Sequence, residues 1–181
     1  MATALVILSP GFEEIEAVTI IDLLRRGGVE VTVAGLGKNP IEGSHGIAVK
    51  PDIYYEEVNG LDYDVLILPG GQPGTNNMKK NPVIIEWIQK RHRSGQWIAA
   101  ICAAPSVLHS AGITDKVMLT SYPSEAHLFR KDQYREDRVV VDGNIITSRG
   151  VGTAIDFALT IVGLLINDRA AKELSKRILH G

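Results

Sequence analysis

A single cysteine, Cys102, is the side chain in this 181-residue sequence whose type and setting best suit covalent chemistry. It follows the apolar run 97–101 and precedes Ala103, Ala104 and Pro105, and a proline is well placed to begin a helix. A nucleophile in such a strand-to-helix turn is exposed at the carboxyl end of its strand, where open α/β sheets bind ligands. The start of the helix would stabilise a thiolate and lower the pKa of the thiol. A buried structural cysteine is the alternative, which residue type alone favours and this position does not.

A pair of glycines after another predicted strand could assist this thiol. Gly70 and Gly71 follow the predicted strand 64–68 and Pro69. Successive glycines allow backbone N–H groups to point into a cleft, where they can stabilise an oxyanion. A plain turn would use the same three residues, so the motif alone is weak evidence for a site.

Three acidic residues open the first predicted helix and could include a proton carrier. Glu13, Glu14 and Glu16 complement the dipole at a helix N-terminus, and this structural role is sufficient to explain them. One of the three could instead face the cleft. A carboxyl group beside a thiolate has a raised pKa and can donate or accept a proton.

The elements that must position these residues follow a βα pattern around a mostly parallel sheet. We predict strands at 5–8, 29–34, 64–68 and 97–101, a hairpin formed by 138–141 and 145–147, and a small hairpin or edge strands within 43–55. We predict helices at 13–26, 82–92, about 105–111 and 153–166, and a last helix capped by Asp168. Asn81 and Pro82 are typical of a helix start, and Thr153 is expected to cap the apolar helix.

Composition narrows the class of protein. Hydrophobic residues make up 45% and charged residues 22% of the chain, and the formal net charge is −2. This balance offers no basic patch for nucleic acid or an anionic membrane surface. The apolar run at 158–166 is shorter than the roughly 20 residues of a membrane span. With one cysteine and no basic leader at the start, we expect a cytoplasmic protein with a single domain, 1–181.

The ordered set of motifs resembles the ThiJ/PfpI superfamily. It is most similar to the branch that includes the human Parkinson's-disease-associated protein deglycase and bacterial YajL-type proteins. The matching segments are 4–8, 11–18, 22–27, 31–35, 63–71, 99–105 and 147–158, in order across nearly the whole chain.

The resemblance implies a flavodoxin-like three-layer sandwich, usually a homodimer, that needs no cofactor. It implies that Cys102 is the nucleophile, that Glu16 is its carboxyl partner, and that Gly71, with Gly70 beside it, and Ala103 supply backbone N–H groups. Activities attributed to this branch are the conversion of glyoxals to hydroxy acids and the repair of glycated groups. A stress-response chaperone role and redox sensing by cysteine oxidation are attributed to it as well.

Two departures from the superfamily pattern bear on mechanism. Some members carry a histidine beside the cysteine, after a strand that corresponds to 116–120, and the matching residue here is Tyr122. A phenol with a pKa near 10 is a poor proton shuttle at neutral pH, which favours a Cys–Glu pair over a Cys–His mechanism. The protease-like members have a histidine directly after the cysteine, where this chain has Ala103, and this disfavours an intracellular cysteine peptidase.

Three further residues are candidates for the cleft. Arg149 could anchor a carboxylate or form a structural salt bridge, and Arg26 and His45 are the others. The five histidines show no metal-ligand spacing, and neither 35–37 nor 150–152 completes a dinucleotide-binding motif, so we expect no metal and no cofactor.

The sequence is compatible with two functions, and both use the Cys102 thiol. The first is an enzyme in which Cys102 attacks the aldehyde carbon of a 2-oxoaldehyde, so its partner would be a small carbonyl compound. The second is a redox sensor or chaperone whose thiol is oxidised to the sulfinate. A scaffold without chemistry would require Glu16 to lie far from Cys102.

Overall fold

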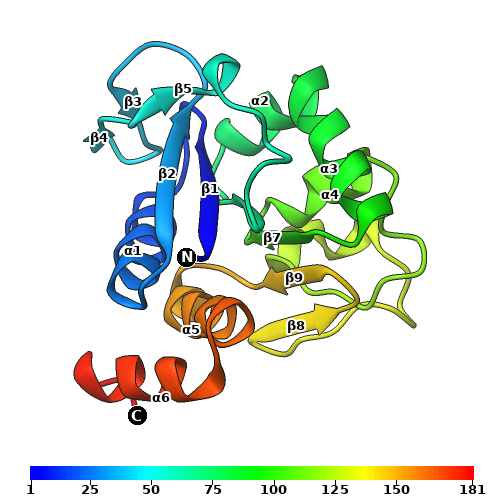
Figure 1. Ribbon diagram of the computed structural model, residues 1–181. Helices are drawn as coiled ribbons and strands as arrows, with labels where there is room; N and C mark the ends of the chain where they lie inside the picture. The colour runs from blue at the N-terminus through cyan, green and yellow to red at the C-terminus, as the bar shows by residue number, and fades with distance from the viewer.

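The computed structural model describes residues 1–181 and is built on a curled seven-stranded sheet in the order β5-β2-β1-β6-β7-β9-β8 (Figure 1). All pairings are parallel except that between β8 and β9. The strands are β1 (Thr3–Leu8), β2 (Glu30–Gly35), β5 (Ile53–Tyr54), β6 (Val65–Leu68), β7 (Trp97–Ile101), β8 (Val139–Asp142) and β9 (Ile145–Ser148). A separate hairpin pairs β3 (Ile41–Glu42) with β4 (Ala48–Val49).

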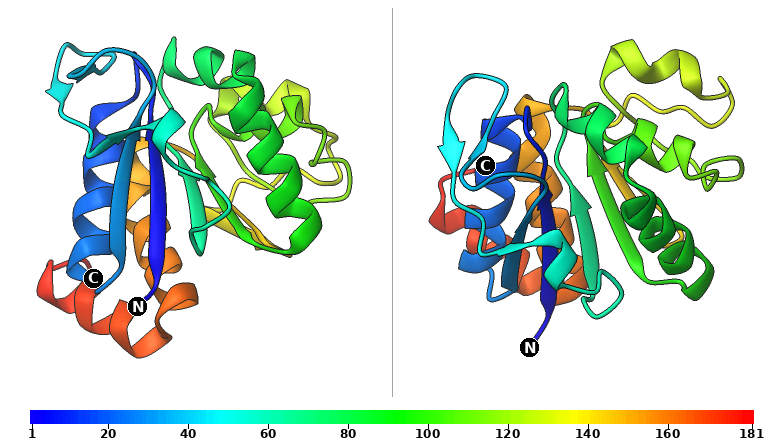
Figure 2. Two further views of the ribbon diagram at one scale, coloured as in Figure 1. Left: turned by 45° about the horizontal axis from the view of Figure 1, so that its top comes forward. Right: turned by 90° about the horizontal axis from the view of Figure 1, so that it is seen from above.

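Helices cover both faces of the sheet, which makes the fold a flavodoxin-like α/β sandwich (Figures 1 and 2). One face is covered by α1 (Glu14–Arg26) and α5 (Ala154–Leu165), with α6 (Asp168–Arg177) packed on α5. The other face carries α2 (Gly74–Lys80), α3 (Pro82–Ser94) and α4 (Pro105–Ser110). Short 3-10 turns complete the chain: η1 (Tyr55–Glu57), η2 (Pro123–Leu128) and η3 (Val151–Thr153). None of the helices is both long enough and apolar enough to cross a lipid bilayer.

The central strands read as continuous apolar runs because both of their faces are buried. Along β1, Val6 packs into the core on the α1 and α5 side, whereas Ile7 packs into the core under α2, α3 and α4. The same alternation holds along β6, where Leu66 and Ile67 enter opposite cores. The two cores lock the register of the strands whose carboxyl ends carry the candidate site.

The strand order places a topological switch between β1 and β6, from which the chain winds outward in both directions. In open α/β sheets, ligands bind outside the carboxyl ends of the strands at such a point. The segments that leave β1, β6, β7 and β9 at this edge contain, respectively, Glu16, Gly70, Cys102 and Arg149. The fold therefore brings together residues from four distant parts of the chain.

A buried arginine ties the opposite ends of β6 and β7 together. The Arg91 guanidinium donates hydrogen bonds to the carbonyl oxygens of Gly60, Tyr63, Asp64 and Trp97 at 2.7–3.0 Å. Burial lowers its pKa to about 10. Because four carbonyls depend on this one side chain, it fixes where the two strands begin.

Most predicted elements are confirmed, including Asn81, whose side chain accepts from the N–H groups of Val83 and Ile84. Three details were wrong or missed. The helix α2 was not predicted, and the strand expected at 116–120 is reduced to one bridge between Leu119 and Tyr134. The last helix is capped by Asn167, whose side chain accepts from Ala170 N–H, so Asp168 is its first residue.

Candidate active site

Cys102 occupies a strained turn between β7 and α4. Its φ of 63° lies in the left-handed region, which residues other than glycine adopt at a cost in free energy. The turn is held from both sides, because Cys102 N–H donates to Ser148 O at 3.0 Å and Tyr122 N–H donates to Cys102 O at 2.7 Å. The side chain is half-buried and reaches the surrounding pocket. This is the geometry of a nucleophile elbow.

Glu16 lies beside the cysteine, one turn into α1 and completely buried. Its Oε2 accepts a hydrogen bond from Gly70 N–H at 2.9 Å. Its Oε1 has no nitrogen or oxygen partner, and the Cys102 thiol is the group positioned to engage it. A methyl group placed on Gly150 would be 3.9 Å from both Cys102 Sγ and Glu16 Oε1, so these two atoms lie next to the same point.

Glycine is required at the turn after β6 because the chain passes directly against this pair. A methyl group on Gly70 would fall 2.6 Å from Cys102 Cβ and 2.8 Å from Glu16 Oε2. Gly71 has a φ of 93°, and its backbone lies against Glu13. The N–H groups of Gly71 and Ala103 have no backbone acceptor and lie beside the cysteine sulfur, where both act to lower the thiol pKa.

The ionisation of the two groups is coupled. Burial raises the pKa of Glu16 to about 7, against the lowering effect of the neighbouring Cys102 thiol and of the hydrogen bond from Gly70 N–H. Burial also raises the pKa of the Cys102 thiol, and an ionised Glu16 raises it further. The expected lowering of the thiol pKa is therefore wrong, because burial and the ionised Glu16 outweigh the N–H groups that favour a thiolate. A thiolate forms when the carboxyl keeps its proton, so the pair shares one negative charge.

A pocket of about 470 Å³ surrounds the pair. Besides Cys102 and Glu16, it is lined by Glu13, His45, Tyr122, Pro123, Arg149, Gly150, Val151, Gly152 and Thr153. Thr153 is the N-cap residue of α5, as expected, but its hydroxyl makes no capping bond to that helix. The hydroxyl accepts instead from the N–H groups of Arg149 and Gly150 and so shapes the wall after β9. The segment 150–152, uninformative as a nucleotide motif, is a wall of this pocket.

Of the four other predicted site residues, three line the pocket and one lies outside it. Tyr122, His45 and Arg149 line the pocket, and Tyr122 is 50% exposed at its rim. Arg149 forms no salt bridge and donates one hydrogen bond to Glu136 O at 3.2 Å. Arg26 does not reach this pocket, because it lies at the far end of α1 and pairs with Asp22 at 2.7 Å.

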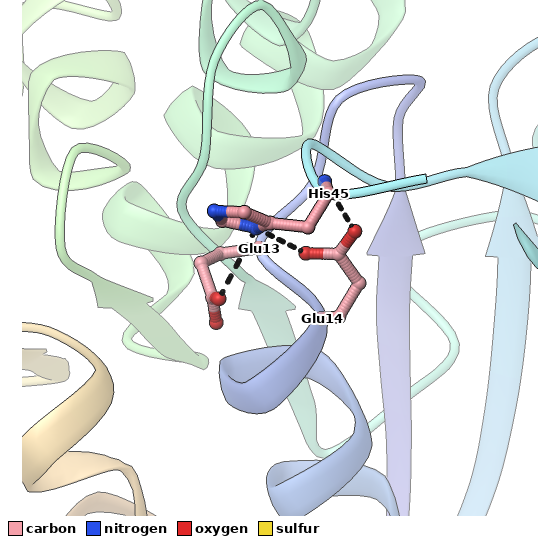
Figure 3. Close-up of side chains that lie close together, drawn as sticks. All are labelled: Glu13, Glu14 and His45. Carbon is pink, nitrogen blue, oxygen red and sulfur yellow. Dashed lines mark hydrogen bonds and ion pairs between the residues drawn. The ribbon is translucent and has the colours of Figure 1, made fainter. Parts of the chain in front are cut away.

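Glu14 anchors the loop that brings His45 to the pocket (Figure 3). Its carboxylate accepts from the His45 backbone N–H at 2.5 Å and from His45 Nδ1 at 2.9 Å. These contacts lower the pKa of Glu14 to about 2 although the side chain is buried. Glu13, Glu14 and His45 each offer a ligand atom within 4.8 Å of the others. The spacing of histidines could not reveal this group, because His45 and Glu14 are 31 residues apart.

The fold and the site define a class of protein: a flavodoxin-like α/β protein with a cysteine on a nucleophile elbow beside a buried glutamate. Residues 2–164 match the model of the DJ-1/PfpI family, and the chain belongs to that family.

Relatives with known names match nearly the whole chain. It is 43% identical over 180 residues to protein dj-1beta of Drosophila melanogaster, covering 98% of this chain and 96% of that one. It is 36% identical over 176 residues to the glutathione-independent glyoxalase DJR-1.2 of Caenorhabditis elegans, covering 96% and 94%. Among solved structures, oxidized Toxoplasma gondii DJ-1 superimposes with a TM-score of 0.96 at 36% identity, covering 100% of both chains.

Proposed function

We propose that this protein converts 2-oxoaldehydes, free or attached to glycated groups, to 2-hydroxy acids without a cofactor, as part of the response to carbonyl stress. The observation that carries the proposal is the placement of Cys102 Sγ and Glu16 Oε1 on one point of a pocket. The relative from Caenorhabditis elegans that is named a glutathione-independent glyoxalase supports it.

The reaction needs no external oxidant or reductant. The Cys102 sulfur adds to the aldehyde carbon, and the carbonyl oxygen takes up the thiol proton to give a hemithioacetal. Glu16, as carboxylate, removes the proton from that carbon, and the resulting enediol is reprotonated on the neighbouring carbon. The former aldehyde carbon is thereby oxidised to a thioester while the ketone carbon is reduced to an alcohol. Water then cleaves the C–S bond, releasing the 2-hydroxy acid and the thiol.

Backbone groups would stabilise the charge that develops during these steps. The N–H groups of Gly71 and Ala103 beside the sulfur are free to donate to the oxygen of the adduct. They are fixed by the turns after β6 and β7, so they cost no reorganisation when the charge appears. Tyr122 has no part in proton transfer in this scheme, because Glu16 is the group that is buried against the thiol.

Product analysis tests this proposal. Methylglyoxal incubated with the purified protein and no added cofactor should give one lactate for each methylglyoxal consumed, over many turnovers. Loss of methylglyoxal limited to about one equivalent per Cys102, without lactate, would contradict the proposal. That result would mean that the thiol only captures the aldehyde.

Redox sensing is a second candidate, favoured by the buried Glu16 carboxyl, whose raised pKa of about 7 lets it donate a proton to an oxidised sulfur. A solved relative described as oxidized supports it. Two equivalents of peroxide would convert the thiol first to sulfenate and then to sulfinate, releasing two waters. If methylglyoxal is not turned over but peroxide adds two oxygens to Cys102 by mass spectrometry, sensing replaces catalysis as the function.

We propose in addition that the chain forms a homodimer through α1. Ile15 and Val18 on this helix are 55% and 48% exposed, and Ile155 on the adjoining α5 is 36% exposed. Apolar side chains gathered on one face are typical of a surface that is covered by a partner. In contrast to these exposed apolar side chains, the charged side chains of Glu14 and Glu16 on the same helix are buried.

Sedimentation equilibrium tests the dimer. The wild-type protein should have twice the 19.7 kDa mass of the chain, and Val18→Asp should weaken association by at least about tenfold, because it places a charge in an apolar contact. Val83→Asp, on α3 and 38% exposed, is the matched control and should remain dimeric. A monomeric wild type, or a Val18→Asp protein that associates as tightly as the control, would contradict the proposal.

A further inference from the structure

The imidazole of His45 is a fixed hydrogen-bond donor at the mouth of the pocket. Glu14 holds its Nδ1, and Ser44 Oγ lies 3.0 Å from the same nitrogen. In Figure 3 the other ring nitrogen, Nε2, lies on the side of the ring away from Glu14. No group of the protein accepts a hydrogen bond from it. Glu14, with a smaller effect of Glu13, raises the pKa of His45, so its ring carries a positive charge more readily than a free histidine.

The guanidinium of Arg149 is a second cationic group in the same lining. Its backbone is held at the end of β9 by the hydroxyl of Thr153 at 3.2 Å. The side chain is half-buried, has no acidic partner and uses one of its five N–H donors, toward Glu136 O. A half-buried arginine without an ion pair retains its capacity for a bidentate contact with a carboxylate.

The acidic groups near the pocket do not occupy the free donors of His45 and Arg149. Glu13 Oε2 accepts from Glu16 N–H at 2.7 Å, so the start of α1 offsets its charge, and Glu14 is occupied by the backbone N–H and Nδ1 of His45, which leaves Nε2 free. Glu16 is the buried partner of the cysteine. The side-chain donors left free at the pocket surface are therefore those of His45 and Arg149, with the hydroxyl of Tyr122.

We propose that His45 and Arg149 bind an anionic end of the substrate, so that the preferred substrates are 2-oxoaldehydes that carry a carboxylate. This inference rests on the proposed function and specifies its substrate class. The aldehyde end meets Cys102 and the carboxylate end meets the two cationic groups. A pocket of about 470 Å³ has room for a substrate of five carbons.

A matched pair of substrates separates charge from size. The probe is 4,5-dioxopentanoate, and its neutral counterpart is 2-oxopentanal, which has the same number of carbons and a methyl group in place of the carboxylate. We expect kcat/KM for the carboxylate substrate to exceed that for the neutral one by about tenfold or more, mainly through KM, because a charge-assisted contact is involved. A ratio near one in the wild-type protein would overturn the inference.

Two variants test whether His45 and Arg149 cause the preference for the carboxylate substrate. His45→Gln and Arg149→Gln should each reduce the wild-type ratio of the two kcat/KM values by about fivefold or more. His109→Gln and Arg93→Gln, exposed on α4 and α3, are matched controls that should keep the ratio. An unchanged ratio in both pocket variants would overturn the inference even if the wild-type protein prefers the carboxylate.

Equilibrium binding distinguishes failure of this inference from failure of the proposed function. Cys102→Ser protein should bind 2-hydroxyglutarate, the product expected from the probe, about tenfold more tightly than 2-hydroxypentanoate by calorimetry, and His45→Gln should remove the difference. Equal binding of the two acids overturns the carboxylate site. Tighter binding of 2-hydroxyglutarate without turnover of either aldehyde supports the carboxylate site and contradicts the enzymatic function.

Discussion

Cys102→Ser is expected to lower kcat/KM for methylglyoxal by about 10³-fold or more. A serine hydroxyl at this position has the same surroundings but remains protonated at neutral pH, because its partner Glu16 is too weak a base to ionise it. The left-handed turn, the hydrogen bonds from Tyr122 N–H and to Ser148 O, and the pocket all depend on the backbone and stay in place.

The measurement is initial-rate lactate formation, with the denaturant midpoint of each protein as a check on folding. The free energy of unfolding should change by less than about 1 kcal/mol, since one small polar group replaces another. A Cys102→Ser protein that folds normally and retains a tenth of the wild-type rate would remove the covalent mechanism.

Glu16→Gln is expected to lower kcat/KM by roughly 10²- to 10⁴-fold, the range for loss of a general acid–base group. The amide can still accept from Gly70 N–H, but it cannot carry a proton between the two substrate carbons. Glu86→Gln, an exposed residue of α3 paired with Lys90, is the matched control and should keep the wild-type rate.

The same substitution should stabilise the protein at high pH. The pKa of Glu16 is about 7 in the folded protein, against 4.5 as its ordinary value. The protonated Glu16 carboxyl therefore makes its full contribution to the free energy of unfolding below pH 4.5, and this contribution is lost as the pH rises through 7. Glutamine does not ionise, so the advantage of Glu16→Gln in urea unfolding should grow between pH 4.5 and pH 8 by as much as about 3 kcal/mol. An advantage that is the same at both pH values would contradict a buried, ionising Glu16.

The elbow could be predicted from sequence because its signals are local. An apolar strand, small residues and a proline adjoin Cys102, and each acts on its immediate neighbours. Local signals were not sufficient to select Glu16 rather than Glu13 or Glu14. Helical periodicity alone leaves all three near the N-terminus of α1, and it was the resemblance to a family that selected one of them.

Contacts made between distant segments could not be predicted. The role of Glu14 depends on a loop that reaches it from residue 45, and the pocket wall at 150–152 depends on the position of β9 beside β7. Arg26 was placed in the cleft although ten residues of helix separate it from Glu16, roughly 15 Å along the axis. The strand expected at 116–120 does not form, because the N–H groups of Met118 and Thr120 donate to side chains of β8 and β9 and not to backbone carbonyls of a strand.

The central claim, that Cys102 and Glu16 share one proton and one charge, is tested most directly by the pH dependence of Cys102 alkylation. The protein has one cysteine, so iodoacetamide uptake measures this thiol alone. In the wild-type protein the alkylation rate should rise with an apparent pKa above that of a free cysteine, because burial and the ionised Glu16 both raise the pKa of the thiol. In Glu16→Gln the midpoint should move down by at least about one pH unit, because the neutral amide no longer opposes a negative charge on the sulfur. Superimposable profiles for the two proteins, or a wild-type midpoint near that of a free cysteine, would contradict the pairing.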